Sequence, residues 1–222
     1  MTSTAVYAGS MTPSLILASA SPARTKLLTD AGIAHRVLVS DVDEDAATAA
    51  AGELSPAETA LLLARAKAES VAALGAGGSG AGGSGADGAG GLVLGCDSVF
   101  ELAGVPYGKP WEPEVARARW RQMRGQSGIL HTGHWLVSAS GASVGAVTSA
   151  VVHFEDVTDA EIDAYVATGE PLQVAGAFTI DGLAGAFISG IEGDPHTVVG
   201  LSISTLRRLL AQAGVSITDL WE

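Results

Sequence analysis

A short apolar run that leads through a hydroxyl-rich turn into a helix limits the fold more than any other feature of this chain. Residues 15–18, Leu-Ile-Leu-Ala, predict a buried strand. Ser21 is a good N-cap, Pro22 suits the first helical position, and Gly32 can end the helix. Such a unit directs backbone N–H groups and the positive end of a helix dipole at one point. It predicts either an anion site or a well-capped unit without a ligand.

Charge and composition narrow the classes of partner. The 222 residues include 12 Lys and Arg against 24 Asp and Glu, a formal net charge of −12, which argues against a nucleic-acid partner but not against a small anion. Apolar residues make up 47% of the chain, as in a globular protein, and no run is long enough to cross a bilayer, so we expect no membrane partner. The lone Cys96 excludes an intramolecular disulfide and fits a reducing cytoplasm.

Strand and helix patterns alternate along the first half of the chain, and a hairpin is expected near Ala103-Gly104. This order predicts an α/β fold with a mixed sheet. Further strands are expected at 35–39, 92–100, 134–140 and 144–154, with short ones near Phe178 and Phe187. Further helices are expected from Ser55, over 113–124, from Thr158 to Gly169, and over 202–213.

The chain is expected to form a single domain over residues 14–222, after a flexible N-terminus at 1–13. Residues 75–91, GAGGSGAGGSGADGAGG, have the composition of a flexible linker. We interpret them as a disordered loop within the domain, because neither flank looks complete without the other.

Asp97 is the candidate for chemistry, because it follows the apolar residues 92–94 and a buried aspartate is costly unless it is paired or metal-bound. We place it at the end of that strand, where ligands bind in open α/β sheets. It is then either a metal ligand or general base, or an aspartate that caps a turn. Cys96 should face away from Asp97 and act as a small buried apolar residue.

Other polar residues support two interpretations each. Glu44 lies in an acidic cluster that suits Mg²⁺ or Mn²⁺, or that forms a solvated turn. Lys109 lies on a constrained loop, where it can contact a phosphate or remain solvated. His131 and His134 have no convincing ligand spacing and are interpreted as structural residues in a loop and at a strand start.

Short motifs spread from about residue 15 to 210 resemble those of the Maf family of nucleoside triphosphate pyrophosphatases, within the inosine-triphosphatase-like superfamily. Each motif is weak alone, but their order and spacing together are specific. In this chain they are LASASPAR at 17–24 with Leu27-Leu28, Val42-Asp-Glu, LARAK at 63–67, GCDS at 95–98, Gly108-Lys-Pro, MRGQS at 123–127, Tyr165, GEPL at 169–172, AGAF at 175–178, IEGD at 191–194 and Val199-Gly-Leu.

The resemblance implies a mixed, elongated central sheet flanked by helices, with two lobes and a cleft. It implies hydrolysis of a non-standard or pyrimidine nucleoside triphosphate to the monophosphate and pyrophosphate, and it is compatible with a homodimer. By motif position Asp97 is the catalytic carboxylate, and Glu44 and Asp97 hold a divalent metal cation, Mg²⁺ or Mn²⁺. The expected substrate and phosphate contacts are Ser19, Ser21, Arg24, Lys67, Ser98, Lys109 and Asp181.

The chain departs from the family pattern at two places. Ala23 replaces the first of two adjacent arginines, so one phosphate contact is lost or supplied by Lys26. Asp181 stands where members that act on thymidine and uridine triphosphates usually carry glutamine, and residues 193–197 are closer to members that act on 7-methylguanosine triphosphate. One alternative is therefore an enzyme specific for that nucleotide. Two alternatives from other classes are a nucleotide-binding regulator of cell division and an acidic domain that binds a protein.

Replacing residues 75–91 by a short turn should leave turnover within a few-fold of the parent chain, because a Gly/Ser-rich segment cannot build a packed core. The measurement is pyrophosphate release, with thermal melting as the check on folding. Loss of folding on deletion would contradict the interpretation of this segment as a linker.

Overall fold

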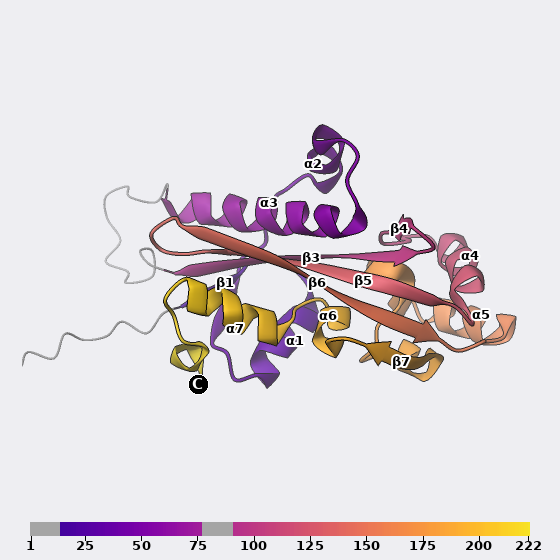
Figure 1. Cartoon of the computed structure of the whole chain (residues 1–222). Helices are drawn as coiled ribbons and strands as arrows, with labels where there is room; N and C mark the ends of the chain where they lie inside the picture. The colour runs from indigo at the N-terminus through magenta and orange to yellow at the C-terminus, as the bar shows by residue number, and fades with distance from the viewer. Residues whose placement is uncertain (1–13, 77–90) are drawn as a thin grey trace, which may run out of the picture.

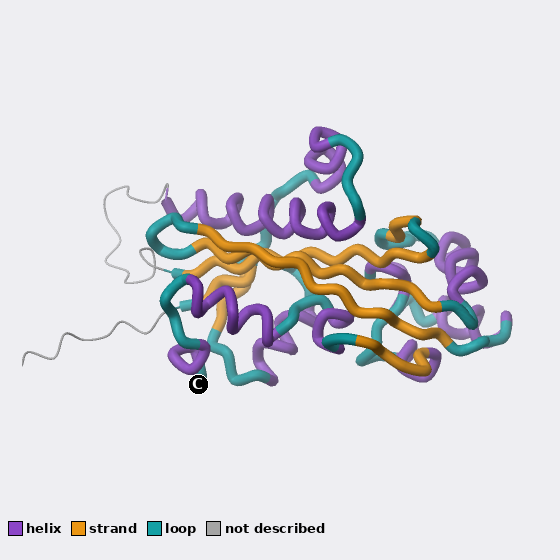
Figure 2. Tube along the Cα trace, in the orientation of Figure 1, coloured by secondary structure: helices purple, strands orange, loops and turns teal. Residues whose placement is uncertain are grey.

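A mixed seven-stranded sheet forms the centre of the molecule. The structure is a computed structural model, and it describes residues 14–76 and 91–222. The N-terminus expected to be flexible and residues 77–90 of the glycine-rich segment lie outside the described residues. Figure 2 shows the strands as one long, twisted layer with helices on both sides.

The strand order across the sheet is β2-β1-β3-β5-β6-β7, with β4 paired to β3. The pairs β2–β1 and β1–β3 are parallel, and all the other pairs are antiparallel. The predicted mixed sheet is therefore confirmed. The bounds are β1 Leu15–Leu17, β2 His35–Val37, β3 Leu92–Leu102, β4 Val105–Tyr107, β5 Ser127–Val137, β6 Ser143–Phe154 and β7 Ile188–Glu192.

Helices cover both faces of the sheet. In Figure 1, α3 lies along one face with α2 beyond it, α1, α6 and α7 lie on the other, and α4 and α5 lie at the far end of the sheet. None of the helices in the described residues is long and apolar enough to cross a membrane. The helices are α1 Pro22–Asp30, α2 Glu44–Ala51, α3 Pro56–Ala76, α4 Pro113–Met123, α5 Asp159–Ala167, α6 Pro195–Val199 and α7 Ile203–Gln212, with 3₁₀ turns η1 Glu170–Gln173, η2 Ala175–Ala177, η3 Leu183–Phe187 and η4 Ile217–Leu220.

Local sequence signals explain the helix starts that were predicted correctly. Ser21 caps α1 and Ser202 caps α7. At the start of α3 the Ser55 backbone N–H donates to Glu58 over 2.8 Å, while Thr158 and Glu161 form a capping box on α5. Each cap satisfies N–H groups that the first helical turn leaves without partners.

Two glycines let α3 lie directly on the sheet. A Cβ atom at Gly95 of β3 would be 2.0 Å from the Ala64 carbonyl oxygen, and one at Gly133 of β5 would be 2.3 Å from that of Ala60. Only residues without a side chain fit at these two positions. The contact fixes α3, which carries Lys67, against the strand that carries Asp97.

The buried side chains form two large clusters that meet along β3. Leu94 and Cys96 belong to one cluster with the leucines of α7, while Phe100 and Leu102 belong to the other with aromatic residues of α4 and α5. Asp97 and Ser98 lie between these pairs in sequence. The polar residues of β3 therefore lie at the boundary between two hydrophobic cores, in agreement with the two-lobed architecture expected from the resemblance.

Two predicted strand positions were wrong. β5 begins at Ser127 rather than His134, so His131 and His134 both lie inside a strand. Gly128 and Gly133 made the sequence look like a loop, yet Phe100 and α3 occupy the space that their side chains would fill. No strand forms at Phe178, because 3₁₀ turns precede and follow it.

Asp97 also lies elsewhere than predicted. It is the sixth residue of an 11-residue strand rather than its last, so it does not cap a turn. Glu44 is the first residue of α2, a helix that was not predicted.

Strand β2 ends at Val37, two residues earlier than predicted, because the chain then turns toward the pocket that Val39 lines. Cys96 faces the core cluster and not the pocket, as predicted.

Gly95→Ala should destabilise the fold by about 1–3 kcal/mol, because the new methyl group meets the backbone of α3 and the helix must shift. Thermal melting should show a loss of roughly 2–4 °C per kcal/mol for a chain of this size. Gly190→Ala in β7 is the control, since its Cβ would be 3.6 Å from the His153 ring, an ordinary contact. Equal melting temperatures for the two variants would contradict the close seating of α3.

Candidate active site

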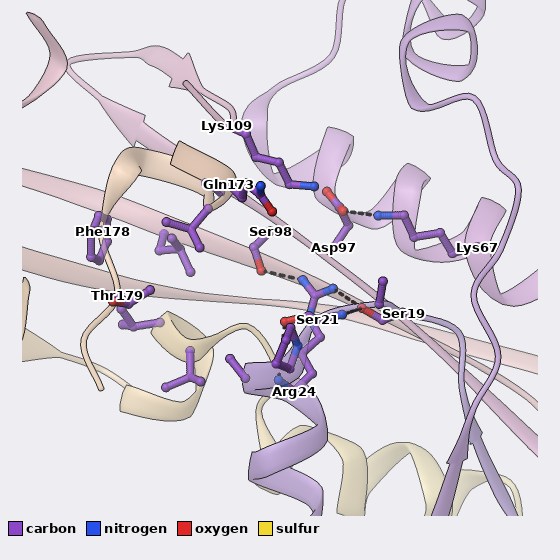
Figure 3. Close-up of a pocket in the computed structure, with 18 of the residues that line it drawn as sticks. Ser19, Ser21, Arg24, Lys67, Asp97, Ser98, Lys109, Gln173, Phe178 and Thr179 are labelled. Atoms are coloured by element: carbon purple, nitrogen blue, oxygen red, sulfur yellow. Dashed lines mark hydrogen bonds and ion pairs between the residues drawn. The ribbon is translucent and has the colours of Figure 1, made fainter. Parts of the chain in front are cut away.

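A pocket of about 520 Å³ opens at the edge of β3, a volume typical of small-molecule sites. On this edge β1 pairs with β3 as far as Leu94, and β4 pairs with it from Phe100 onward. Among the described residues no strand pairs with the stretch between them on that side, and this stretch forms one wall of the pocket. Residues from both faces of β3, Asp97 and Ser98, therefore reach the same cavity (Figure 3).

The N-terminus of α1 forms a second wall, as the strand–turn–helix motif predicted. Ser19, Ser21, Pro22 and Ala23 all line the pocket. Ser21 accepts a hydrogen bond from the Arg24 backbone N–H, and its own N–H donates to the Ser19 hydroxyl over 3.2 Å. The positive end of the α1 dipole thus points toward the cavity, which favours an anion there.

Arg24 connects this wall to two other parts of the chain. Its Nε donates to the Gly200 carbonyl over 2.7 Å, and one terminal nitrogen donates to both Ser19 Oγ and the Cys96 carbonyl at 2.9 Å. The other terminal nitrogen donates to Ser98 Oγ over 3.2 Å. Four of the five guanidinium N–H groups are therefore engaged, and the side chain acts largely as a cross-link.

Gly200 is where this cross-link requires a glycine. Its φ of 113° lies in the left-handed region, and a Cβ atom there would be 3.2 Å from Arg24 Nε and 3.3 Å from Ser98 Oγ. Behind Ser98, buried hydroxyls continue the network: Ser98 Oγ is 2.9 Å from Thr132 Oγ1, which donates to the Thr197 carbonyl. The hydroxyl of Ser98 is thereby held in place from two sides.

Lys67 bridges the two candidate metal ligands. Its Nζ lies 2.5 Å from Asp97 Oδ1 and 2.8 Å from Glu44 Oε1. The Lys67 and Asp97 side chains are 11% and 12% exposed, whereas that of Glu44 is 43% exposed. Helices α2 and α3 thus bring two charged groups to β3 from one side.

The environments of the two carboxylates differ. Burial raises the pKa of Asp97, and the positive charges of Lys67 and Arg24 oppose that rise without cancelling it. Burial also acts to raise the pKa of Glu44, but the hydrogen bond and charge of Lys67 outweigh it, so that pKa is lowered. A carboxylate with a raised pKa is the better proton acceptor near neutral pH, which distinguishes Asp97 as the candidate base.

Lys109 reaches the pocket from the loop after β4. Its Nζ lies 5.3 Å from the centre of the Trp111 ring, and Figure 3 shows it pointing toward Asp97. No carboxylate in the described residues forms an ion pair with it. Lys26 differs, because it pairs with Asp30 at 2.5 Å on an exposed part of α1 and does not line the pocket.

The pocket brings together all the residues predicted for the site. Those that line it are Ser19, Ser21, Arg24, Glu44, Lys67, Asp97, Ser98, Lys109 and Asp181. His131 and His134 do not line it. His134 is fully buried, burial lowers its pKa to about 4, and its Nε2 accepts the Ser202 N–H, in keeping with a structural role.

At the opposite end of the pocket, sequence reasoning named only Asp181. It missed Gln173, Phe178, Thr179 and Ile180, which also line the cavity, and Figure 3 shows Phe178 and Thr179 across from Lys67. The GEPL and AGAF motifs were the signal, since Gln173 follows the first and Phe178 ends the second. Trp111 beside Lys109 was also missed, although an aromatic residue that is 60% exposed and has a φ of 60° is unusual.

The carboxylates fit a divalent cation that arrives with a ligand. No group of three or more His, Cys, Asp or Glu side chains that could hold a metal occurs among residues 14–76 and 91–222. Glu44 and Asp97 supply oxygen donors from two sides of Lys67. Mg²⁺ typically binds through one or two carboxylates together with substrate phosphates, so this pair suits it as a partial site.

Comparison with known proteins agrees with these motifs and this geometry. The sequence model described as Maf-like protein matches residues 14–213. The chain belongs to the Maf family.

Bacterial relatives share about half of its residues over almost the whole length. A protein of Leifsonia xyli subsp. xyli named nucleoside triphosphate pyrophosphatase is 54% identical over 215 residues, covering 93% of this chain and 96% of that relative. A protein of Streptomyces coelicolor with the same name is 54% identical over 208 residues, covering 93% and 94%. Among solved structures, the Staphylococcus aureus Ham1 protein matches 90% of this chain and 99% of its own, with 13% identity and a TM-score of 0.44.

Proposed function

We propose that this Maf-family protein hydrolyses nucleoside triphosphates between the α- and β-phosphates. The products are a nucleoside monophosphate and pyrophosphate, and the substrate class is a non-standard or pyrimidine nucleoside triphosphate. The observation that carries the proposal is one pocket in which Arg24, Lys67 and Lys109 lie around the carboxylate of Asp97. Relatives 54% identical over nearly the whole chain bear the name nucleoside triphosphate pyrophosphatase.

Asp97 is proposed as the general base. Water attacks the α-phosphorus, its proton passes to the Asp97 carboxylate, and the bond to the bridging oxygen breaks so that pyrophosphate leaves. The raised pKa of Asp97 supports this role, because a carboxylate with a higher pKa is a stronger proton acceptor. Lys67, 2.5 Å from Oδ1, orients the carboxylate before substrate binds.

The cations neutralise the charge that develops on the phosphates. Phosphoryl transfer needs positioning and electrostatic stabilisation more than covalent chemistry. Lys109 and the N-terminus of α1 are proposed to hold the triphosphate, with Ser19, Ser21 and Ser98 as hydroxyl contacts. Arg24 contributes mainly its positive charge and the alignment of Ser19 and Ser98, since its donors are largely engaged.

Two further parts of the proposal concern metal and compartment. Glu44 and Asp97 would hold Mg²⁺ or Mn²⁺, which supplies charge neutralisation at the phosphate oxygens when bound. The repulsion expected between a triphosphate and the carboxylates of Glu44, Asp97 and Asp181 supports such a cation.

We place the protein in the cytoplasm, and the buried, unpaired Cys96 supports a reducing compartment.

The other candidate functions have less support. The names of the relatives do not favour an enzyme restricted to 7-methylguanosine triphosphate, a regulator of cell division or a protein-binding domain. A regulator or a binding domain also does not require three cations around a buried carboxylate.

The proposed reaction is tested by identifying its products. The full chain is incubated with Mg²⁺ and a panel of standard and modified nucleoside triphosphates, and phosphate products are resolved by ion chromatography. We expect pyrophosphate and a monophosphate in equal amounts. Orthophosphate with a nucleoside diphosphate would contradict the proposal, because it places attack at the γ-phosphorus.

Asp97→Asn should keep the fold and lower turnover by roughly 100- to 10,000-fold, the usual contribution of a general base. Asparagine keeps the shape of the side chain but neither accepts the proton nor carries the charge. The melting temperature should stay the same or rise, because a buried charge is removed. Near-normal turnover would exclude Asp97 as the base and make Glu44 the leading candidate.

Lys109→Ala should lower both substrate affinity and turnover, because a phosphate contact strengthens as charge shifts in the transition state. Lys26→Ala is the matched control, since it removes a lysine that does not line the pocket. Steady-state kinetics of both variants provide the measurement. Equal kinetics in the two would show that Lys109 makes no phosphate contact.

A further inference from the structure

Glu170 is a carboxylate outside the pocket that organises one of its walls. It begins η1, directly after Gly169. Its Oε1 accepts hydrogen bonds from the Tyr165 hydroxyl at 3.0 Å, from Thr179 Oγ1 and from the Ala184 N–H at 3.4 Å. Its Oε2 accepts the Leu183 N–H at 3.1 Å. One side chain therefore ties α5 to both ends of the segment 179–184.

The segment held in this way carries pocket-lining residues. Thr179, Ile180 and Asp181 line the cavity, whereas Glu170 does not. A Cβ atom at Gly182 would be 2.3 Å from Thr179 Oγ1 and 2.6 Å from Glu170 Oε1, so the loop is packed directly on the carboxylate. Movement of Glu170 must therefore move the pocket wall.

The charge state of Glu170 suits this role. Burial acts to raise its pKa, but the hydrogen bonds from Thr179, Leu183 and Tyr165 outweigh that effect and the pKa is lowered. Its carboxylate stays ionised at neutral pH and accepts all these donors. No lysine or arginine in the described part of the chain forms an ion pair with it, so hydroxyls and backbone N–H groups alone balance the charge.

The loop lies across the cavity from the carboxylate of Asp97 and its partner Lys67. Lys67, Asp97 and Glu44 are together on one side, and Phe178 and Thr179 are across the cavity (Figure 3). Next to Phe178 and Thr179 in sequence, the apolar Val174 and Ile180 and the polar Asp181 also line the cavity. This chemistry fits the base and sugar of a nucleotide, with an aromatic surface and a few polar groups.

We infer that Glu170 is a positioning residue for nucleoside selection: it fixes the loop 179–184, and through that loop it determines which base the pocket accepts. This inference rests on the proposed function. Glu170 does not touch the phosphates, so its loss should affect discrimination between bases and leave phosphate binding intact.

The test compares Glu170→Gln with Glu161→Gln. Glutamine keeps the size of the side chain, but its amide nitrogen cannot accept a hydrogen bond. Glu161 is a matched control, because its carboxylate, like that of Glu170, accepts hydrogen bonds from both backbone and hydroxyl groups. Its donors are the backbone N–H and the hydroxyl of Thr158, both at 2.7 Å, and Glu161 does not line the pocket. For each protein, kcat/KM is measured over a panel of nucleoside triphosphates, together with the inhibition constant of inorganic tripolyphosphate and the melting temperature.

In Glu170→Gln, the ratio of kcat/KM between the preferred and the poorest nucleotide should fall about tenfold, equivalent to ~1.4 kcal/mol. The inhibition constant of tripolyphosphate, which has no base, should stay within about twofold, a change equivalent to less than ~0.5 kcal/mol. Glu161→Gln should alter neither quantity. Unchanged selectivity in Glu170→Gln, or an equal loss in tripolyphosphate affinity, would overturn the inference.

Tyr165→Phe keeps the test decisive if Glu170→Gln does not fold. It removes a single donor to Glu170 Oε1 while the ring keeps its packing against Trp120 and Phe187. Selectivity should fall two- to threefold with the tripolyphosphate constant unchanged, and unaltered selectivity would overturn the inference. Absence of pyrophosphate release by the parent chain with any nucleotide would instead overturn the proposed function itself.

Discussion

Arg24 is 8% exposed, and no aspartate or glutamate in the described residues forms an ion pair with its guanidinium. A buried charge without a counter-ion is costly, so the oxygens that solvate it must be held in place. Here they come from Ser19, Ser98 and two carbonyls on segments far apart in the sequence. The same side chain joins α1, β3 and the connection after α6, and it leaves a positive field that an anion in the pocket would relieve.

The second constraint is the direct contact of α3 with the sheet. Because Gly95 and Gly133 let the helix backbone touch the strands, backbone packing fixes the separation between the segments that carry Lys67 and Asp97. Lys67 reduces the cost of burying Asp97 before any ligand binds. The raised pKa that supports the proposed role of Asp97 as a base thus coexists with a folded apoprotein, as expected where function and stability oppose each other.

Much of the fold could be predicted because its signals are local. Caps such as Ser21, Ser55 and Thr158 define helix starts within four residues, and the motif residues at 19, 24, 67, 97 and 109 do line one pocket. The start of β5 could not be predicted, because its glycines are explained only by Phe100 and α3, which are distant in sequence. Glu170 was missed for the same reason, since its partners on the loop 179–184 follow it by 9 to 14 residues and no local pattern links them.

The gap on one side of β3 has a further consequence for the protein in a crowded solution. An unpaired strand edge invites pairing with a strand of another chain, the first step toward aggregation. Between Leu94 and Phe100, however, the Arg24 guanidinium donates to the Cys96 carbonyl of β3. A neighbouring strand that used this carbonyl would have to displace a buried charge. The arginine that organises the pocket therefore also makes this stretch of the central strand a poor template for another chain.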